Sequence, residues 1–81
     1  MNFLVEVSVM LKEGIADPQG QTIERALPAL GFKGVQGVRV GKRIVLSLDA
    51  SDEGDARRRA HDMCDKLLAN PVIESYEVSL S

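Results

Sequence analysis

The chain has 81 residues, which is enough for one hydrophobic core and too few for two. Hydrophobic residues make up 44% and charged residues 27%, a balance that is typical of a folded globular domain and excludes a disordered chain. The formal net charge of −2 speaks against nucleic-acid or anionic-membrane binding. We therefore predict a single domain, residues 1–81, without a nucleic-acid or membrane partner.

A core of this size supplies only about 3–5 kcal/mol unless disulfides, metal or self-association add to it. Cys64 is the only cysteine and His61 the only histidine, so an internal disulfide is excluded and a metal site is not expected. Self-association remains as the source of extra stability. The first residues lack the features of a signal peptide and no apolar run has membrane-spanning length, so we expect a cytoplasmic protein.

The first predicted elements are a strand and a helix. Apolar residues occupy every odd position from Phe3 to Leu11, which predicts a strand with one buried face. After a loop over residues 12–16, Asp17 and Pro18 have the character of an N-cap and a first helical residue. The expected buried stripe of this helix is Ile23, Ala26, Leu27 and Leu30, with Pro28 kinking the last turn and Gly31 ending it.

The second half of the chain predicts a hairpin, a helix and a final strand. Val38 and Val40 alternate with polar residues before a tight turn at Gly41-Lys42, and alternation resumes from Ile44 to Leu48. Ser51 or Asp52 then caps a helix that Asn70-Pro71 ends, and residues 72–80 form the last strand. The expected buried stripe of this helix is Ala56, Ala60, Met63, Cys64, Leu67 and Leu68.

This element order predicts an α+β fold, the ferredoxin-like βαββαβ two-layer sandwich with both helices on one face of an antiparallel sheet. The bare face would then carry Leu4, Met10 and Val45 among polar residues. These three side chains are candidates for self-association, because a half-apolar face suits an interface. The alternative is that they are ordinary scattered surface residues.

No group of residues has the pattern of a catalytic site. Cys64 falls on the predicted buried stripe, where a cysteine packs as a small hydrophobe, and His61 lies one position off it. The three arginines of residues 57–59 fan around the helix and do not converge on one ligand. The loop from Gly14 to Gly20 precedes a helix N-terminus and is either a weak anion site or a plain turn.

Three stretches, taken together, resemble the PurS family, the small subunit of bacterial and archaeal phosphoribosylformylglycinamidine synthase. The first is Lys12 to Ile23, which contains Asp-Pro-Gln-Gly and is followed by Ala26-Leu27 and Leu30-Gly31-Phe32. The second is Val38-Arg39-Val40-Gly41-Lys42, and the third runs from Cys64 to Tyr76 and contains Leu-Leu-Ala-Asn-Pro-Val-Ile-Glu. Their order and spacing extend the resemblance over essentially the whole chain.

The resemblance implies an accessory role in purine biosynthesis. A glutaminase subunit, PurQ, would release ammonia, and a synthetase subunit, PurL, would use it with ATP and magnesium, so no cofactor is expected in this chain. This chain would be a homodimer or tetramer that bridges the two and supports assembly and ammonia transfer. A rival hypothesis is a small regulatory metabolite-binding module with a ligand at the loop after the first strand.

The residues that the resemblance assigns to subunit contact lie in loops and at element ends. For each of them a purely local structural role is the alternative. No catalytic, cofactor-binding or metal-binding residue is implied. The contact candidates are Asp17, Pro18, Gln19, Gly20, Arg39, Gly41, Lys42, Asn70, Pro71, Glu74 and Tyr76.

Overall fold

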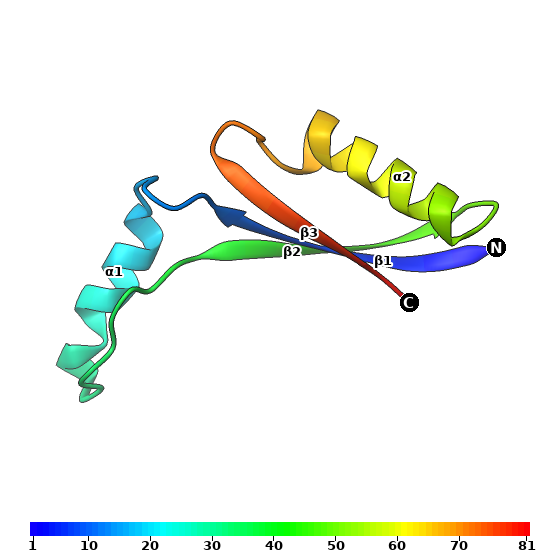
Figure 1. Cartoon of the computed structure of the whole chain (residues 1–81). Coiled ribbons are helices and arrows are strands. Elements are labelled where there is room, and N and C mark those ends of the chain that lie inside the picture. Colours follow the sequence, from blue (N-terminus) through cyan, green and yellow to red (C-terminus); the bar gives the residue numbers. More distant parts are fainter.

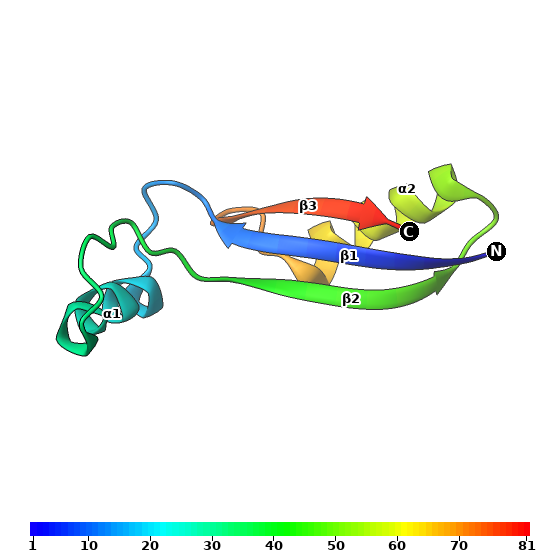
Figure 2. The same cartoon turned by 90° about the horizontal axis from the view of Figure 1, so that it is seen from below.

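A computed structural model describes residues 1–81 and shows a helix packed on a three-stranded antiparallel sheet (Figure 1). The sheet order is β2-β1-β3, so β1 is the central strand (Figure 2). Two short helical segments, a 3-10 turn η1 and a π-helical turn η2, follow the two α-helices. In chain order the elements are β1 (Asn2–Leu11), α1 (Pro18–Ala26), η1 (Pro28–Leu30), β2 (Gly41–Asp49), α2 (Glu53–Met63), η2 (Cys64–Leu68) and β3 (Glu74–Leu80).

The core lies between α2 and one face of β1. Val5, Val7 and Val9 alternate along β1 and are at most 1% exposed. Opposite them, α2 contributes small side chains, Ala56 and Ala60, which allow the helix to approach the sheet closely. The expected alternation of β1 and the first part of the α2 stripe are therefore confirmed, as is the α+β two-layer class.

The predicted hairpin is wrong, and with it the fourth strand of the βαββαβ order. A single strand, β2, begins at Gly41, where a turn is predicted, and Gly41 pairs with Met10 of β1. The backbone N–H groups of Val38 and Val40 donate to the side chains of Glu24 and Asp17 instead of to a neighbouring strand. Residues 38–40 therefore lie outside the sheet.

The prediction that both helices cover one sheet face is also wrong. Residues 12–40, which we call the α1 lobe, project from the end of the sheet away from both termini (Figures 1 and 2). The chain measures 51 × 25 × 15 Å and has a radius of gyration of 16.3 Å, against about 12 Å for a compact domain of this length. Only Gly20 is buried in the lobe, so its apolar side chains have no core of their own.

Both helices end in a way that changes which side chains are buried. Pro28 ends α1 and starts η1, and Gly31 closes η1 with a positive φ of 94°, as expected. On the predicted α1 stripe Ile23 is 38% exposed and Leu30 is 70% exposed. Asp52 caps α2, as one of the two expected caps, but the π-helical turn η2 places Leu67 outside the core, at 83% exposure. The predicted buried stripe of α1 is therefore wrong at Ile23, Ala26 and Leu30, with Leu27 only partly buried, and that of α2 is wrong at Leu67.

The chain ends meet at the opposite end of the sheet from the α1 lobe (Figure 1). Ser81 exchanges two backbone hydrogen bonds with Leu4, of 2.9 and 3.0 Å. The N-terminal ammonium of Met1 donates to the carbonyl of Ala50 at 3.0 Å. Both termini are therefore fixed to the sheet.

Candidate subunit-contact site

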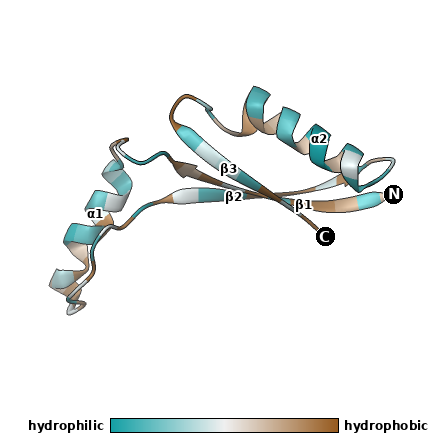
Figure 3. Cartoon of the chain, in the orientation of Figure 1, coloured by the Kyte–Doolittle hydropathy of each residue, from teal (hydrophilic) through white to brown (hydrophobic).

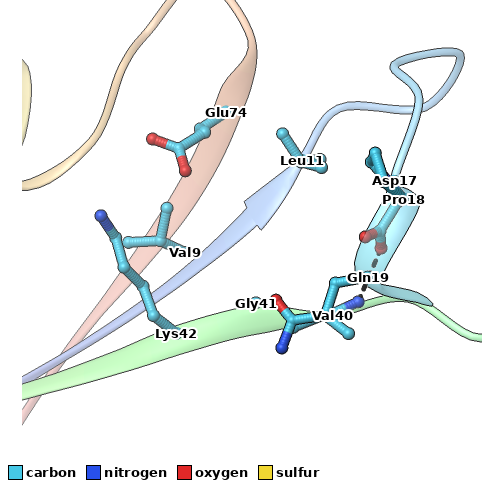
Figure 4. Close-up of a pocket in the computed structure, with 9 residues that line it drawn as sticks. All are labelled: Val9, Leu11, Asp17, Pro18, Gln19, Val40, Gly41, Lys42 and Glu74. Atoms are coloured by element: carbon cyan, nitrogen blue, oxygen red, sulfur yellow. Dashed lines mark hydrogen bonds between the residues drawn. The ribbon is translucent and has the colours of Figure 1, made fainter. Parts of the chain in front are cut away.

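A pocket of about 360 Å³ lies where the α1 lobe joins the sheet (Figure 4). Its lining residues come from the end of β1 and from the starts of α1, β2 and β3. Six of its lining residues are predicted contact residues: Asp17, Pro18, Gln19, Gly41, Lys42 and Glu74. The remaining lining residues are Val9, Leu11 and Val40.

Asp17 fixes the geometry of this junction. One carboxylate oxygen accepts the backbone N–H of Gly20 at 2.9 Å, which caps α1, and the other accepts the N–H of Val40 at 2.8 Å. These two hydrogen bonds lower the pKa of Asp17 below its ordinary value of 3.8. The same side chain therefore starts the helix, which confirms the predicted N-cap, and it also attaches the segment that enters β2, which the sequence did not predict.

Gly20 is required by the close approach of this segment to α1. A β-carbon at position 20 would collide with the carbonyl oxygen of Val38 and with the carboxylate of Asp17. Glu24, one turn further along α1, accepts the N–H of Val38 at 3.1 Å. The helix and the incoming segment are thus joined at two successive turns.

Arg39 belongs to the segment that enters β2, and it lines an adjoining depression of about 460 Å³. Its guanidinium donates to the carbonyl of Leu11 at the end of β1. The loop from Lys12 to Ala16 lines the same depression and includes Gly14, which has a positive φ of 84°. The predicted residues Asp17 and Arg39 therefore come together, although they are far apart in the sequence.

The third sequence stretch is tied to the junction by Lys12. Its ammonium donates to the carbonyl of Pro71, and its backbone N–H donates to the carbonyl of Ile73, both at 2.8 Å. Two hydrogen bonds of 2.7 Å between Asn70 and Glu74 hold the turn. The backbone N–H of Asn70 donates to the carboxylate of Glu74, and the backbone N–H of Glu74 donates to the carbonyl of Asn70. In Figure 4, Lys42 and Glu74 point toward one another above Val9.

Tyr76 is the one contact candidate on β3 that faces α2 and not the pocket. Its hydroxyl donates to a carboxylate oxygen of Asp65 at 3.0 Å and lies 3.2 Å from Nδ1 of His61. The pKa of Tyr76 is raised, mainly because its hydroxyl is shielded from solvent and secondly because it is bonded to Asp65. The sequence analysis, which placed His61 only by its position beside the buried stripe, missed this three-residue array because its members lie on different elements.

The remaining candidate groups have structural explanations. The Cys64 side chain is buried in the core, and this burial, with the nearby Asp65 carboxylate, raises the pKa of its thiol. Arg57 pairs with the carboxylate of Glu53, whereas Arg58 and Arg59 both contact the carboxylate of Asp55, and Arg59 also donates to the carbonyl of Asp49. The structure contains no group of three or more metal-ligating side chains and no helix of membrane-spanning length and hydropathy.

The bare sheet face carries Leu4, Met10 and Val45, as the register requires. Leu4 is 40% and Val45 is 53% exposed, and Met10 is partly buried. The ion pair of Glu6 with Arg43, at 2.6 Å, lies on the same face. Self-association through these three side chains stays a prediction.

Comparison with known proteins identifies the family. The family model described as PurS, phosphoribosylformylglycinamidine (FGAM) synthase, matches residues 4–81. The PurS subunit of that synthase from Archaeoglobus fulgidus is 43% identical over 75 residues, which cover 93% of this chain and 94% of the relative. The PurS subunit from Bacillus subtilis is 45% identical over 74 residues, with 91% and 87% covered.

The fold is also similar to that of solved PurS structures. A chain in the structure described as PurLQS from Thermotoga maritima superposes with a TM-score of 0.91 at 34% identity, and the match covers 100% of this chain and 99% of that one. The resemblance of the three sequence stretches is thus confirmed along the whole molecule. The chain belongs to the PurS family.

Proposed function

We propose that this chain is the small accessory subunit of phosphoribosylformylglycinamidine synthase in purine biosynthesis, and that it joins the glutaminase PurQ to the synthetase PurL. The observation that carries the proposal is the full-length match to the PurS family, together with the likeness to a chain of the PurLQS structure. In this role the chain supports assembly and the transfer of ammonia. We place the complex in the cytoplasm, with ATP and magnesium held by the synthetase partner.

The geometry of the site suits a bridging role. The three stretches that define the resemblance meet at the junction of sheet and α1 lobe, where Asp17, Arg39 and Lys12 each bond to the backbone of another segment. These bonds hold a surface of fixed shape, which is what a docking subunit needs. The metabolite-binding alternative has only the open depression beside Gly14 in its favour and is not preferred.

Self-association is part of this proposal, and the α1 lobe is the surface that supports it best. The lobe exposes several large apolar side chains that have no cover within the chain. Single exposed residues of this kind are ordinary, but a whole segment with only Gly20 buried is not stable alone. The exposed residues are Ile15, Ile23, Leu30, Phe32 and Val35.

A second copy offers a place for this lobe. Helix α2 packs against β1 and β3, and the core-facing side chains Ile44 and Leu46 of β2 are only partly buried. A two-layer sandwich normally places a second helix over such a half-covered face. We propose that α1 of a second copy lies there, which gives a homodimer with two equivalent contacts, and that such dimers can pair as tetramers.

Reconstitution tests the proposed function. The chain is added to purified PurQ and PurL from the same organism, and formation of the amidine product is measured with glutamine as the nitrogen donor. We expect activity to depend on the chain. The matched control supplies ammonium chloride instead of glutamine, which bypasses the glutaminase and should need the chain far less. Equal glutamine-dependent rates with and without the chain would refute the proposal.

A further inference from the structure

The pocket where the α1 lobe joins the sheet contains two opposite charges that face one another without pairing. Lys42 stands near the start of β2 and Glu74 at the start of β3, and their side chains point toward one another (Figure 4). Neither residue takes part in any ion pair of the chain. A gap between an ammonium and a carboxylate is therefore left open in the pocket.

The sheet determines the shape of this gap. Strand β1 lies between β2 and β3, so the backbones of the two outer strands are about 9–10 Å apart. Lys42 is the register partner of Val9, and Glu74 is that of Leu11. These two β1 side chains and Val40 form the apolar floor, and the end of β1 is hydrophobic in Figure 3. The pocket thus has an apolar floor between a cation and an anion.

Both charged groups are available to a ligand. Lys42 is exposed, and one carboxylate oxygen of Glu74 accepts the N–H of Asn70 at 2.7 Å, which leaves the other oxygen free. The third charged side chain of the pocket, Asp17, uses both of its oxygens to accept backbone N–H groups. Lys42 and Glu74 therefore determine which charges the pocket can accept.

This arrangement of charges selects one class of ligand. Glu74 repels an anion such as phosphate, and Lys42 repels a metal cation. A chain terminus of a partner protein carries only one of the two charges that the pocket can pair. A free α-amino acid carries both, and hydrogen bonds between charged groups are stronger than those between neutral ones.

We propose that this pocket binds a free α-amino acid as its zwitterion, with the carboxylate on Lys42 and the ammonium on Glu74. The volume of about 360 Å³ is near the lower end of the range for ligand pockets, about 300–1,000 Å³, which suits a small metabolite. The ligand's own side chain lies on the apolar floor, near the amide of Gln19 in the wall. The site differs from the depression beside Gly14, and it adds to the accessory role without replacing it.

A ligand in this pocket contacts two parts of the molecule at once. Pro18 and Gln19 belong to the α1 lobe, whereas Lys42 and Glu74 belong to the sheet. Their common ligand adds contacts across a junction that otherwise depends on a few polar bonds. Amino-acid binding therefore restrains the lobe that we assign to the second copy; this consequence, unlike the binding itself, rests on the proposed function.

Titration followed by NMR tests the inference. L-Glutamine, L-leucine and glycine are added separately to the isotope-labelled full chain, and the backbone amide shifts are followed. We expect saturable shifts at Gln19, Gly41 and Glu74 with at least one of the three, and none at Gly54, at the start of α2. Two analogues of the amino acid that binds, the N-acetyl derivative without the ammonium and the amide without the carboxylate, should bind at least about tenfold more weakly.

Matched variants test the two charged residues. Glu74→Gln keeps an oxygen that can accept the N–H of Asn70, and Lys42→Met keeps the length of the side chain. We expect each change to weaken binding at least about tenfold. The controls are Glu77→Gln, on the opposite face of β3, and Lys33→Met, at an exposed position of the α1 lobe. Both should leave the affinity within about twofold of the parent.

Three outcomes would overturn the proposal. Absence of saturable shifts with all three amino acids excludes the site. Equal binding of either analogue would mean that the pocket recognises one charge only. Unchanged affinity in both Lys42→Met and Glu74→Gln, whose spectra show that they are folded, would place the ligand elsewhere. The titration uses the chain alone, so its failure leaves the proposed function intact, and failure of the reconstitution leaves the binding site intact.

Discussion

The carboxylate of Asp17 accepts the backbone N–H of Val40 at 2.8 Å, across 23 residues of sequence. This bond closes the base of the α1 lobe, because Asp17 stands where the chain leaves the loop after β1 and Val40 stands where it enters β2. The lobe has no buried apolar core, so its position depends on a few polar bonds of this kind.

Replacing Asp17 by alanine should loosen the lobe without unfolding the sheet. The variant loses the N-cap of α1 and the bond to Val40 at once. We expect amide hydrogen exchange at Gly20 and Val40 to accelerate by roughly fivefold or more, and exchange at Val7 in the core to change little. Thr22→Ala, which removes a single exposed hydroxyl bond to Pro18, is the control. Uniform acceleration over the whole chain would contradict this local role.

Acid should destabilise the chain through Asp17 and Asp55. Backbone hydrogen bonds, from Gly20 and Val40 to Asp17 and from Ser51 to Asp55, lower the pKa of both carboxyls below 3.8. On acidification the unfolded chain therefore binds protons at a higher pH than the folded chain does. The stability that these two carboxylates contribute is present above pH 3.8 and is lost as the pH falls through their lower folded-state pKa values. Melting temperatures from pH 7 down to about pH 2.5 measure the loss, and Asp17→Asn should flatten the acid limb. An unchanged acid limb in that variant would exclude Asp17 as a contributor.

Gly20→Ala should separate α1 from the segment that enters β2. The added methyl group would collide with the carbonyl of Val38, a backbone atom that cannot move aside as a side chain can. Gly54→Ala is the matched control, since its methyl group meets only the Asp52 side chain at 3.4 Å and alanine favours a helix over glycine by about 1 kcal/mol. Urea unfolding should show Gly20→Ala less stable and Gly54→Ala equally or more stable than the parent. The reverse order would show that the junction does not form as described.

Charge on the α1 lobe should disrupt self-association. Leu30 is 70% exposed in the single chain, and in the proposed homodimer it is covered by the second copy. Leu30→Asp is expected to weaken the dimer by about tenfold or more, and the conservative surface change Arg25→Gln is expected to leave it intact. Sedimentation over a range of concentrations measures both. A dimer that tolerates Leu30→Asp but dissociates with Val45→Asp would favour the bare sheet face instead.

The thiol of Cys64 should react only slowly with alkylating reagents while the chain is folded. Its side chain is fully buried, and burial raises the pKa of the thiol, so both access and thiolate are lacking. Iodoacetamide should label it on the order of a hundredfold more slowly than the unfolded chain, a ratio that a stability of about 3 kcal/mol allows. Labelling at the unfolded rate would mean that α2 is not packed on the sheet.

The sequence pattern predicts what local rules determine. Alternation along β1, the cap at Asp17 and the left-handed Gly31 all follow from short-range geometry and are confirmed. The hairpin failed because alternation at Val38 and Val40 resembles a strand, whereas their N–H groups bind the carboxylates of Glu24 and Asp17. Nothing in the local pattern distinguishes a carboxylate partner from a strand partner.

The two misplaced leucines show a second limit. Helical spacing places Leu30 and Leu67 on apolar stripes, but a stripe indicates only that the side chain needs an apolar neighbour, not that the neighbour belongs to the same chain. The α1 lobe leaves the sheet and exposes Leu30, and the π turn exposes Leu67. Six residues named from the resemblance line one pocket, and their part in subunit contact stays a prediction.

The attachment of both chain ends to one end of the sheet has a practical consequence. Ser81 bonds to Leu4, and Met1 bonds to Ala50. A fluorophore or fused domain at either chain end is therefore attached at a fixed position, at the end of the sheet opposite the α1 lobe. In a molecule 51 Å long, energy transfer from such a label to a dye on PurQ or PurL would report which partner lies at which end.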